Sequence, residues 1–156
     1  MKSNSIVFAV AFSVFLALLG SVFPLSVQLS WLRPEWVCLV VLYWLLKMPH
    51  LFGIGTAWCI GLLQDVVVDG VWGANALALA IVAYVCQMSY RRLRTYGIAQ
   101  QTIWVFVLVG VHQLFVNWVH SMDGYSMPAR MMILSTAVSA AMWPLMVFLL
   151  RLSWAR

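Results

Sequence analysis

Six long apolar stretches, separated by short polar or charged linkers, dominate this sequence. The first stretch, residues 6–23, carries no charged residue and is followed by Pro24. A helix of about 20 apolar residues crosses the roughly 30 Å hydrocarbon core of a bilayer. Five further stretches of this kind cover residues 34–46, 51–68, 72–88, 99–118 and 131–150. The pattern predicts an all-α polytopic membrane protein with six transmembrane helices.

The composition agrees with a bilayer as the solvent of the chain. Hydrophobic residues make up 65% of the sequence and charged residues only 8%, with a mean hydropathy of +0.98. Soluble domains average about 45–50% apolar and about 25% charged residues, so this chain has too few polar side chains to cover a surface in water. Because the linkers are short, residues 1–156 are expected to form a single transmembrane domain.

Basic residues are shared unevenly between the two sides of a six-span topology, which places both termini on one side. That side receives seven of them: Lys2, Lys47, Arg91, Arg92, Arg94, Arg151 and Arg156. The other side receives Arg33, Arg130 and all four acidic residues. The positive-inside rule therefore predicts cytoplasmic termini. The basic excess is assigned to topology and to anionic membrane lipids, and binding of nucleic acid is not expected.

The second stretch is short for a span. Pro34 and Glu35 suit the first turn of its helix. Four aromatic side chains near its two ends are expected to anchor it at the membrane interfaces: Trp31, Trp36, Tyr43 and Trp44.

Gly53, Ala57 and Gly61 recur every four residues and form a stripe of small residues on the third span. Small residues let helix backbones approach closely in lipid, where helix association depends on packing. We expect this stripe to pack within the chain, against a matching face of the fourth span; an interface with another protein is the alternative. The matching face holds Ala76, Ala80 and Ala83.

Asp65 and Asp69 stand at the far end of the third span and share one helix face if the helix continues. A pair of carboxylates could relay protons, bind a cation or act in acid–base chemistry. The simpler interpretation, which we favour, is that both lie at the water interface, where they cap or solvate a helix end, with Asp69-Gly70 forming a turn.

The fifth span is the most polar, with His112, Gln113 and Asn117 close together. Polar side chains within a membrane usually face the bundle interior or a partner helix. They could line a site for a solute or a proton, but hydrogen bonds between helices are the simpler interpretation.

Motifs for chemistry are missing from the sequence. It contains no glycine loop for nucleotides, no nucleophile elbow and no zinc-protease motif. Cys38, Cys59 and Cys86 are scattered among apolar residues and predict no disulfide framework or metal site. We expect no cofactor, no metal and no enzymatic activity.

Two segments resemble the rod shape-determining protein MreD family. Arg33-Pro34-Glu35-Trp36, with Leu42-Tyr43-Trp44 and the Met48-Pro49 turn, is similar to the second span of that family. The run from Gly61 to Val66, with Asp65, Gly70, Gly73 and the following Ala76-Leu77-Ala78-Leu79, is similar to its central segment.

The resemblance implies a protein of the bacterial cytoplasmic membrane that is not an enzyme. Such a protein partners the bitopic protein MreC and, through it, joins the MreB filaments, the glycan polymerase RodA and a class-B penicillin-binding protein. It also implies a fold similar to the six-helix substrate-binding subunits of energy-coupling-factor transporters. We therefore expect a membrane scaffold that helps to maintain cell shape; the alternative is a subunit that binds or transports a small solute. Gly53, Ala57, Gly61, Asp65, Asp69 and Gly73 are the candidates for partner binding or packing.

Overall fold

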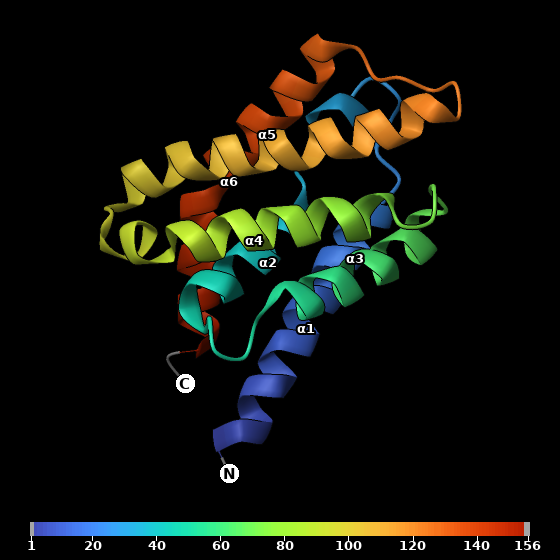
Figure 1. Ribbon diagram of the computed structural model, residues 1–156. Helices are drawn as coiled ribbons and strands as arrows, with labels where there is room; N and C mark the ends of the chain where they lie inside the picture. The colour runs from blue at the N-terminus through green and yellow to red at the C-terminus, as the bar shows by residue number, and fades with distance from the viewer. Residues whose placement is uncertain (1, 155–156) are drawn as a thin grey trace.

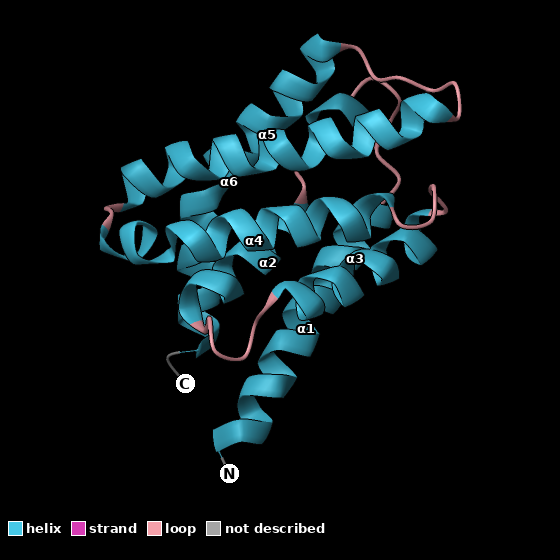
Figure 2. Cartoon of the chain, viewed as in Figure 1, coloured by secondary structure: helices cyan, strands magenta, loops and turns pink. Residues whose placement is uncertain are grey.

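The computed structural model describes residues 2–154, which form helices joined by short loops (Figure 2). In chain order, the elements are α1 (Lys2–Val22), the short 3-10 helix η1 (Ser30–Leu32), α2 (Trp36–Lys47), α3 (Ile54–Val68), α4 (Ala74–Thr95), α5 (Ile98–Met122) and α6 (Ala129–Trp154). Each apolar stretch of the sequence corresponds to one α-helix, with α4, α5 and α6 extending several residues beyond the expected spans, and the expected all-helical class is confirmed.

Three helices are long and apolar enough to cross a membrane, among the residues that the structure describes. They are the segments Asn4–Val22, Ile98–Met122 and Ala129–Leu152. The apolar helix α3 is shorter, and α2 has only 12 residues. These lengths and compositions are those of a helical membrane protein.

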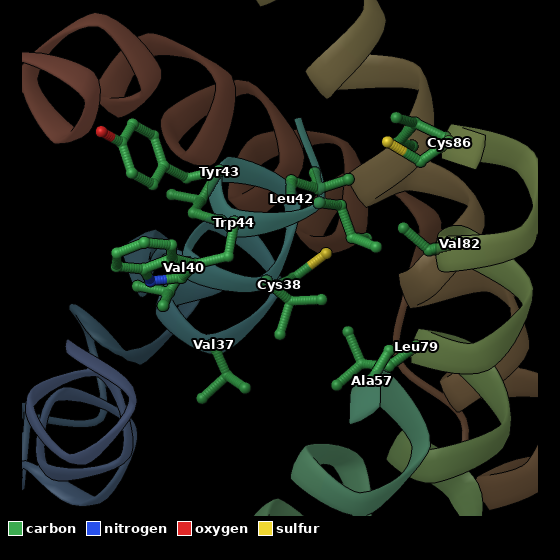
Figure 3. Packing of buried hydrophobic residues seen from close by; sticks show 14 of the residues in the cluster. Val37, Cys38, Val40, Leu42, Tyr43, Trp44, Ala57, Leu79, Val82 and Cys86 are labelled. Atoms are coloured by element: carbon green, nitrogen blue, oxygen red, sulfur yellow. The ribbon is translucent and has the colours of Figure 1, made fainter. Parts of the chain in front are cut away.

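Helix α2 lies at the centre of the bundle, where it packs against α1, α4, α5 and α6. It begins at Trp36, after the N-cap residue Glu35, so the expected start at Pro34 is two residues early. Every residue from Val37 to Leu45 is buried, which matches a helix that is apolar on all sides. Figure 3 shows several of these side chains directed toward neighbouring helices.

The expectation that Tyr43 and Trp44 act as interfacial anchors is wrong, because both are buried in the core. The indole Nε1 of Trp44 donates a hydrogen bond of 2.9 Å to the hydroxyl of Ser13 on α1. This bond satisfies the polar edge of the ring inside the bundle. An aromatic residue near the end of a short apolar run gives the same sequence pattern whether it lies at a membrane interface or in the core of a bundle.

The helices alternate in direction, so the connections gather at two ends of the molecule (Figure 1). One end holds both chain termini, the turn between α2 and α3, and the connection between α4 and α5. The opposite end holds the α1–α2, α3–α4 and α5–α6 connections. This arrangement brings Lys47, Arg94 and Arg151 to one end; Arg156, expected there too, lies outside the described residues.

Candidate functional site

Asp65 is fully buried near the end of α3, and its carboxylate caps the first turn of α4. Oδ2 accepts hydrogen bonds from the backbone N–H of Gly73 at 2.9 Å and of Ala76 at 3.3 Å. Oδ1 accepts from the backbone N–H of Asn75 at 3.0 Å and from its side-chain amide at 2.9 Å. The first N–H groups of a helix have no partner within the helix, and the positive end of its dipole attracts a carboxylate. Asp65 therefore ties α3 to the start of α4.

Asp69 occupies a different environment, although it is only four residues further along the chain. Helix α3 ends at Val68, and Asp69 adopts the left-handed conformation with φ 54°. Its side chain is exposed, whereas that of Asp65 is buried. The two carboxylates do not share a helix face, and the expectation that both lie at the water interface is wrong for Asp65. The turn expected at Asp69-Gly70 is present, with the N–H of Gly70 bonded to the carbonyl of Asp65 at 3.3 Å.

Gly61 lies where α3 closely approaches α4, its partner in the most extensive helix pair of the bundle. A Cβ atom at this position would lie less than 3.0 Å from the backbone of Ala76 and from the carbonyl oxygen of Asn75. Only glycine allows this contact without a shift of one helix. The contact lies one turn from the Asp65 cap, so the two features fix the same helix pair.

The rest of the small-residue stripe also faces the chain itself. Ala57 is fully buried, and Figure 3 places it beside Leu79 of α4. Gly53 is the N-cap of α3, where its N–H donates to the hydroxyl of Thr56 at 2.9 Å. Gly73 is the N-cap of α4 and has a φ of 93°, which favours glycine. These residues pack α3 against α4 and form the tight turn between them.

Gln113 joins three helices through its buried side-chain amide. Its Nε2 donates to the hydroxyl of Ser135 on α6 at 2.8 Å, and its Oε1 accepts from the hydroxyl of Thr136 at 2.9 Å. Nε2 also lies 3.4 Å from Oε1 of Glu35 at the start of α2. These are the interhelical hydrogen bonds that the polar composition of the fifth span suggested.

The hydrogen-bond network continues from Gln113 to the loop that precedes α2. The hydroxyl of Ser135 donates to the carbonyl of Arg33 at 2.8 Å, and the N–H of Glu35 donates to the hydroxyl of Ser139 at 2.9 Å. The guanidinium of Arg33 in turn donates to the carbonyls of Ser21 and Phe23 at 2.7 and 2.8 Å, where α1 ends. One network therefore connects the ends of α1, α2 and α6 with α5.

His112 and Asn117 take separate positions. His112 is buried within α5, and neither ring nitrogen has a hydrogen-bond partner among the described residues. Asn117 accepts a 2.7 Å bond from the N–H of Met127 and so holds the loop before α6. None of His112, Gln113 and Asn117 lines the groove between α1 and α6, and no group of three metal-ligating side chains occurs among residues 2–154.

An open groove of about 870 Å³ runs between α1 and α6, with α2 as its floor. Its walls are almost wholly apolar. They include Ala9, Phe12 and Leu16 of α1, Phe23 just after it, Trp36, Val40 and Trp44 of α2, and Val138, Met142, Met146 and Leu149 of α6. The hydroxyl of Ser13, which also lines the groove, already accepts from Trp44 and donates to the carbonyl of Val10 at 2.8 Å. The groove thus offers an apolar surface with little free hydrogen-bonding capacity.

Comparison with known proteins decides the family. The family model of the rod shape-determining protein MreD matches residues 2–153, which is nearly the whole chain. The chain belongs to the MreD family. The "Rod shape-determining protein MreD" of Haemophilus influenzae is 29% identical over 144 residues, which cover 92% of this chain and 85% of that protein. No solved structure matches this chain.

Membership of the MreD family identifies a shape-determining protein, and its apolar helices indicate a multi-pass protein of the inner membrane. The resemblance seen in the sequence is confirmed.

Sequence reasoning missed two features that the structure places beside the expected ones. The first is the partner set of Gln113, above all the hydroxyl residues of α6; Ser135 and Ser139 lie four residues apart, a spacing that puts them on one helix face. The second is the α1–α6 groove, for which no local pattern gives a signal.

Proposed function

We propose that this chain is a non-enzymatic membrane scaffold whose α1–α6 groove binds the transmembrane helix of an MreC-type partner. Through that partner, the scaffold joins the MreB filaments, RodA and a class-B penicillin-binding protein of the cell-wall elongation machinery. Its six helices form one transmembrane domain with cytoplasmic termini, in keeping with the distribution of basic residues. The observation that carries the proposal is the open apolar groove on a chain of a shape-determining family.

The size of the groove supports a helix as its occupant. Its lining on α1 extends from Ala9 to Gly20, which corresponds to about 17 Å of helix at 1.5 Å per residue. A helix about 10 Å wide and of that length occupies roughly 1300 Å³. The groove volume of about 870 Å³ is about two thirds of this value. The partner helix therefore lies in the groove with one side against α2 and the other side toward lipid.

The chemistry of the groove favours a transmembrane helix over a small solute. Sites for small molecules combine apolar walls with a few polar groups that fix the orientation of the ligand. Here the Ser13 hydroxyl is engaged in both directions, and none of His112, Gln113 and Asn117 lines the groove. A helix satisfies its own backbone and needs only close packing in lipid. The expected likeness to the substrate-binding subunits of energy-coupling-factor transporters stays a prediction.

The stripe on α3 has a supporting role in this proposal. Gly53, Ala57 and Gly61 lie in the α3–α4 pair, and Asp65 and Gly73 hold its outer end. These residues therefore make contacts inside the chain. Helix α3 also packs against α1, and in this way it supports one wall of the groove from behind. Exposed Asp69 is left as a position for contact with the outer part of the partner.

Two pairs of leucines provide a matched test of the groove. Leu16 and Leu149 line it and are 50% and 54% exposed, whereas Leu19 and Leu145 lie on the same helices outside it and are 52% and 48% exposed. We expect the double variant Leu16→Trp/Leu149→Trp to fill the groove and to abolish co-purification of the MreC-type partner in detergent. The variant Leu19→Trp/Leu145→Trp adds the same bulk outside the groove, and we expect it to retain the partner.

The same variants, expressed in cells that lack the native gene, report on shape. We expect rods with the control variant and rounded cells with the groove variant. Equal co-purification by the two variants would refute the groove as the partner site. Loss of partner by both, with unchanged unfolding midpoints, would place the contact on the wider α1 and α6 surfaces instead.

A further inference from the structure

A second hollow, of about 520 Å³, lies at the end of the bundle that carries the chain termini. The turn after α2 and the facing ends of α4, α5 and α6 form its walls. Its polar lining is made chiefly by Lys47, His50, Tyr90, Arg94, Trp143 and Arg151. This hollow, which we call the basic pocket, is separate from the apolar groove between α1 and α6.

The basic pocket has an excess of positive charge in its lining. Among the described residues, three fixed cations line it and no carboxylate does. The chain has only four acidic residues, and all of them belong to other parts of the fold: Glu35, Asp65, Asp69 and Asp123. The phenol of Tyr90 accepts a 3.1 Å hydrogen bond from Nη1 of Arg94, which orients that guanidinium at the rim. A pocket of this charge attracts an anion.

Trp143 supplies an independent observation. Its side chain lines the basic pocket and is 1% exposed, and its Nε1–H has no hydrogen-bond partner among the described residues. A buried N–H without an acceptor is unfavourable, so indole N–H groups usually find one. An acceptor-rich ligand in the pocket would provide one once the side chains that cover this buried N–H move aside. The donors on the walls, two guanidinium groups, an ammonium and an indole, suit the oxygens of a phosphate group.

We propose that the basic pocket binds a phosphate group, with Arg94, Arg151 and Lys47 pairing with its charge and Trp143 donating a hydrogen bond. The two sources of this chemistry are the headgroup of an anionic phospholipid and free inorganic phosphate. The pocket lies where the ends of four helices meet the predicted membrane boundary, so the phosphodiester of a lipid can enter it while the acyl chains stay in the hydrocarbon.

Native mass spectrometry of the purified chain in detergent tests the proposal with three probes: phosphatidylglycerol, phosphatidylethanolamine and inorganic phosphate. We expect bound phosphatidylglycerol at a single saturable site and weaker binding of phosphatidylethanolamine. In the variant Arg94→Gln/Arg151→Gln, we expect the affinity for phosphatidylglycerol to fall about fivefold for each charge removed, hence about 25-fold. The matched control is Arg91→Gln/Arg92→Gln, which removes the same charge from exposed positions of α4 outside the pocket.

Each outcome decides between the sources or against the site. Competition of inorganic phosphate with the lipid at similar concentrations would assign the pocket to free phosphate. Equal losses in the two double variants would show only a diffuse attraction of anions to this end, and the site would be rejected. Trp143→Phe, which removes the N–H and keeps the aromatic bulk, tests the indole: unchanged affinity would exclude it as a donor. None of these variants alters the α1–α6 groove, so the result is independent of partner binding.

Discussion

Asp65→Asn tests whether the carboxylate of Asp65 holds the α3–α4 pair together. The substitution keeps the size and shape of the side chain but replaces one acceptor oxygen by an NH₂ group. Each carboxylate oxygen accepts two hydrogen bonds, one pair from Gly73 and Ala76 and the other from Asn75. If Oδ2 is replaced, the N–H groups of Gly73 and Ala76 lose their acceptor. If Oδ1 is replaced, the N–H of Asn75 loses its acceptor, whereas the Asn75 side-chain amide can flip and offer its oxygen.

The expected loss of stability follows from these contacts. A buried donor without a partner costs about 1–3 kcal/mol, so one or two of them cost about 2–4 kcal/mol. Removal of the negative charge from the positive end of α4 adds about 1 kcal/mol. We therefore expect Asp65→Asn to lower the free energy of unfolding by about 3–5 kcal/mol, a large share of the about 5–15 kcal/mol that is usual for folded proteins.

The measurement is equilibrium unfolding in mixed micelles, followed by the fluorescence of the nine tryptophans. Asp69→Asn is the matched control, because it makes the same change at an exposed position four residues away. We expect the control to stay within about 0.5 kcal/mol of the wild type. Hydrogen exchange should also speed up at the N–H groups of residues 73–76 in Asp65→Asn alone. Equal midpoints for Asp65→Asn and the wild type would refute the capping argument.

Three further substitutions test the packing. Gly61→Ala places a Cβ 2.7 Å from the backbone nitrogen of Ala76, so we expect the free energy of unfolding to fall by about 1–3 kcal/mol in the same assay. Gly55→Ala is the control: nothing lies within 4 Å of its added Cβ, so this change should be neutral or slightly stabilising. Equal effects of the two substitutions would contradict the close approach. Gln113→Leu should lose about 0.6–2 kcal/mol, the range for hydrogen bonds within membranes; a more stable variant would show that the network is not needed for folding. Trp44→Phe should lower the free energy of unfolding by about 1 kcal/mol, because it removes the hydrogen bond to Ser13. Once that bond is absent, the further change Ser13→Ala should have little effect on stability, and a double-mutant cycle measures this coupling.

Local features of the sequence predicted the helices well, because the length of an apolar run is a local property. A helix that crosses hydrocarbon must satisfy its own backbone, and the runs from residue 6 to residue 150 do so as six helices. The turn at Asp69-Gly70 and the small-residue approach at Gly61 follow in the same way, from residue types with few alternatives. The family also has a local signature, in the segment around Asp65 and Gly73.

The sequence pattern could not distinguish an interfacial position from a buried one. Trp44 and Asp65 both stand near the end of an apolar run, where an aromatic residue or a carboxylate commonly meets water. The structure buries both, because α1 covers Trp44 and the first turn of α4 meets Asp65. These partners lie 31 and 10 residues away in the chain.

The sequence by itself determined that lipid surrounds this protein, where its helices lie along the chain, and to which family it belongs. These depend on hydrophobicity along the chain and on short motifs, which need no knowledge of the neighbouring helices. Only the tertiary structure decided that α2 is central, that Asp65 is buried against α4, and that α1 and α6 leave a groove between them. The reason is physical: lipid solvates every apolar face equally, so hydrophobicity does not select which faces meet, and shape complementarity between distant segments makes that choice.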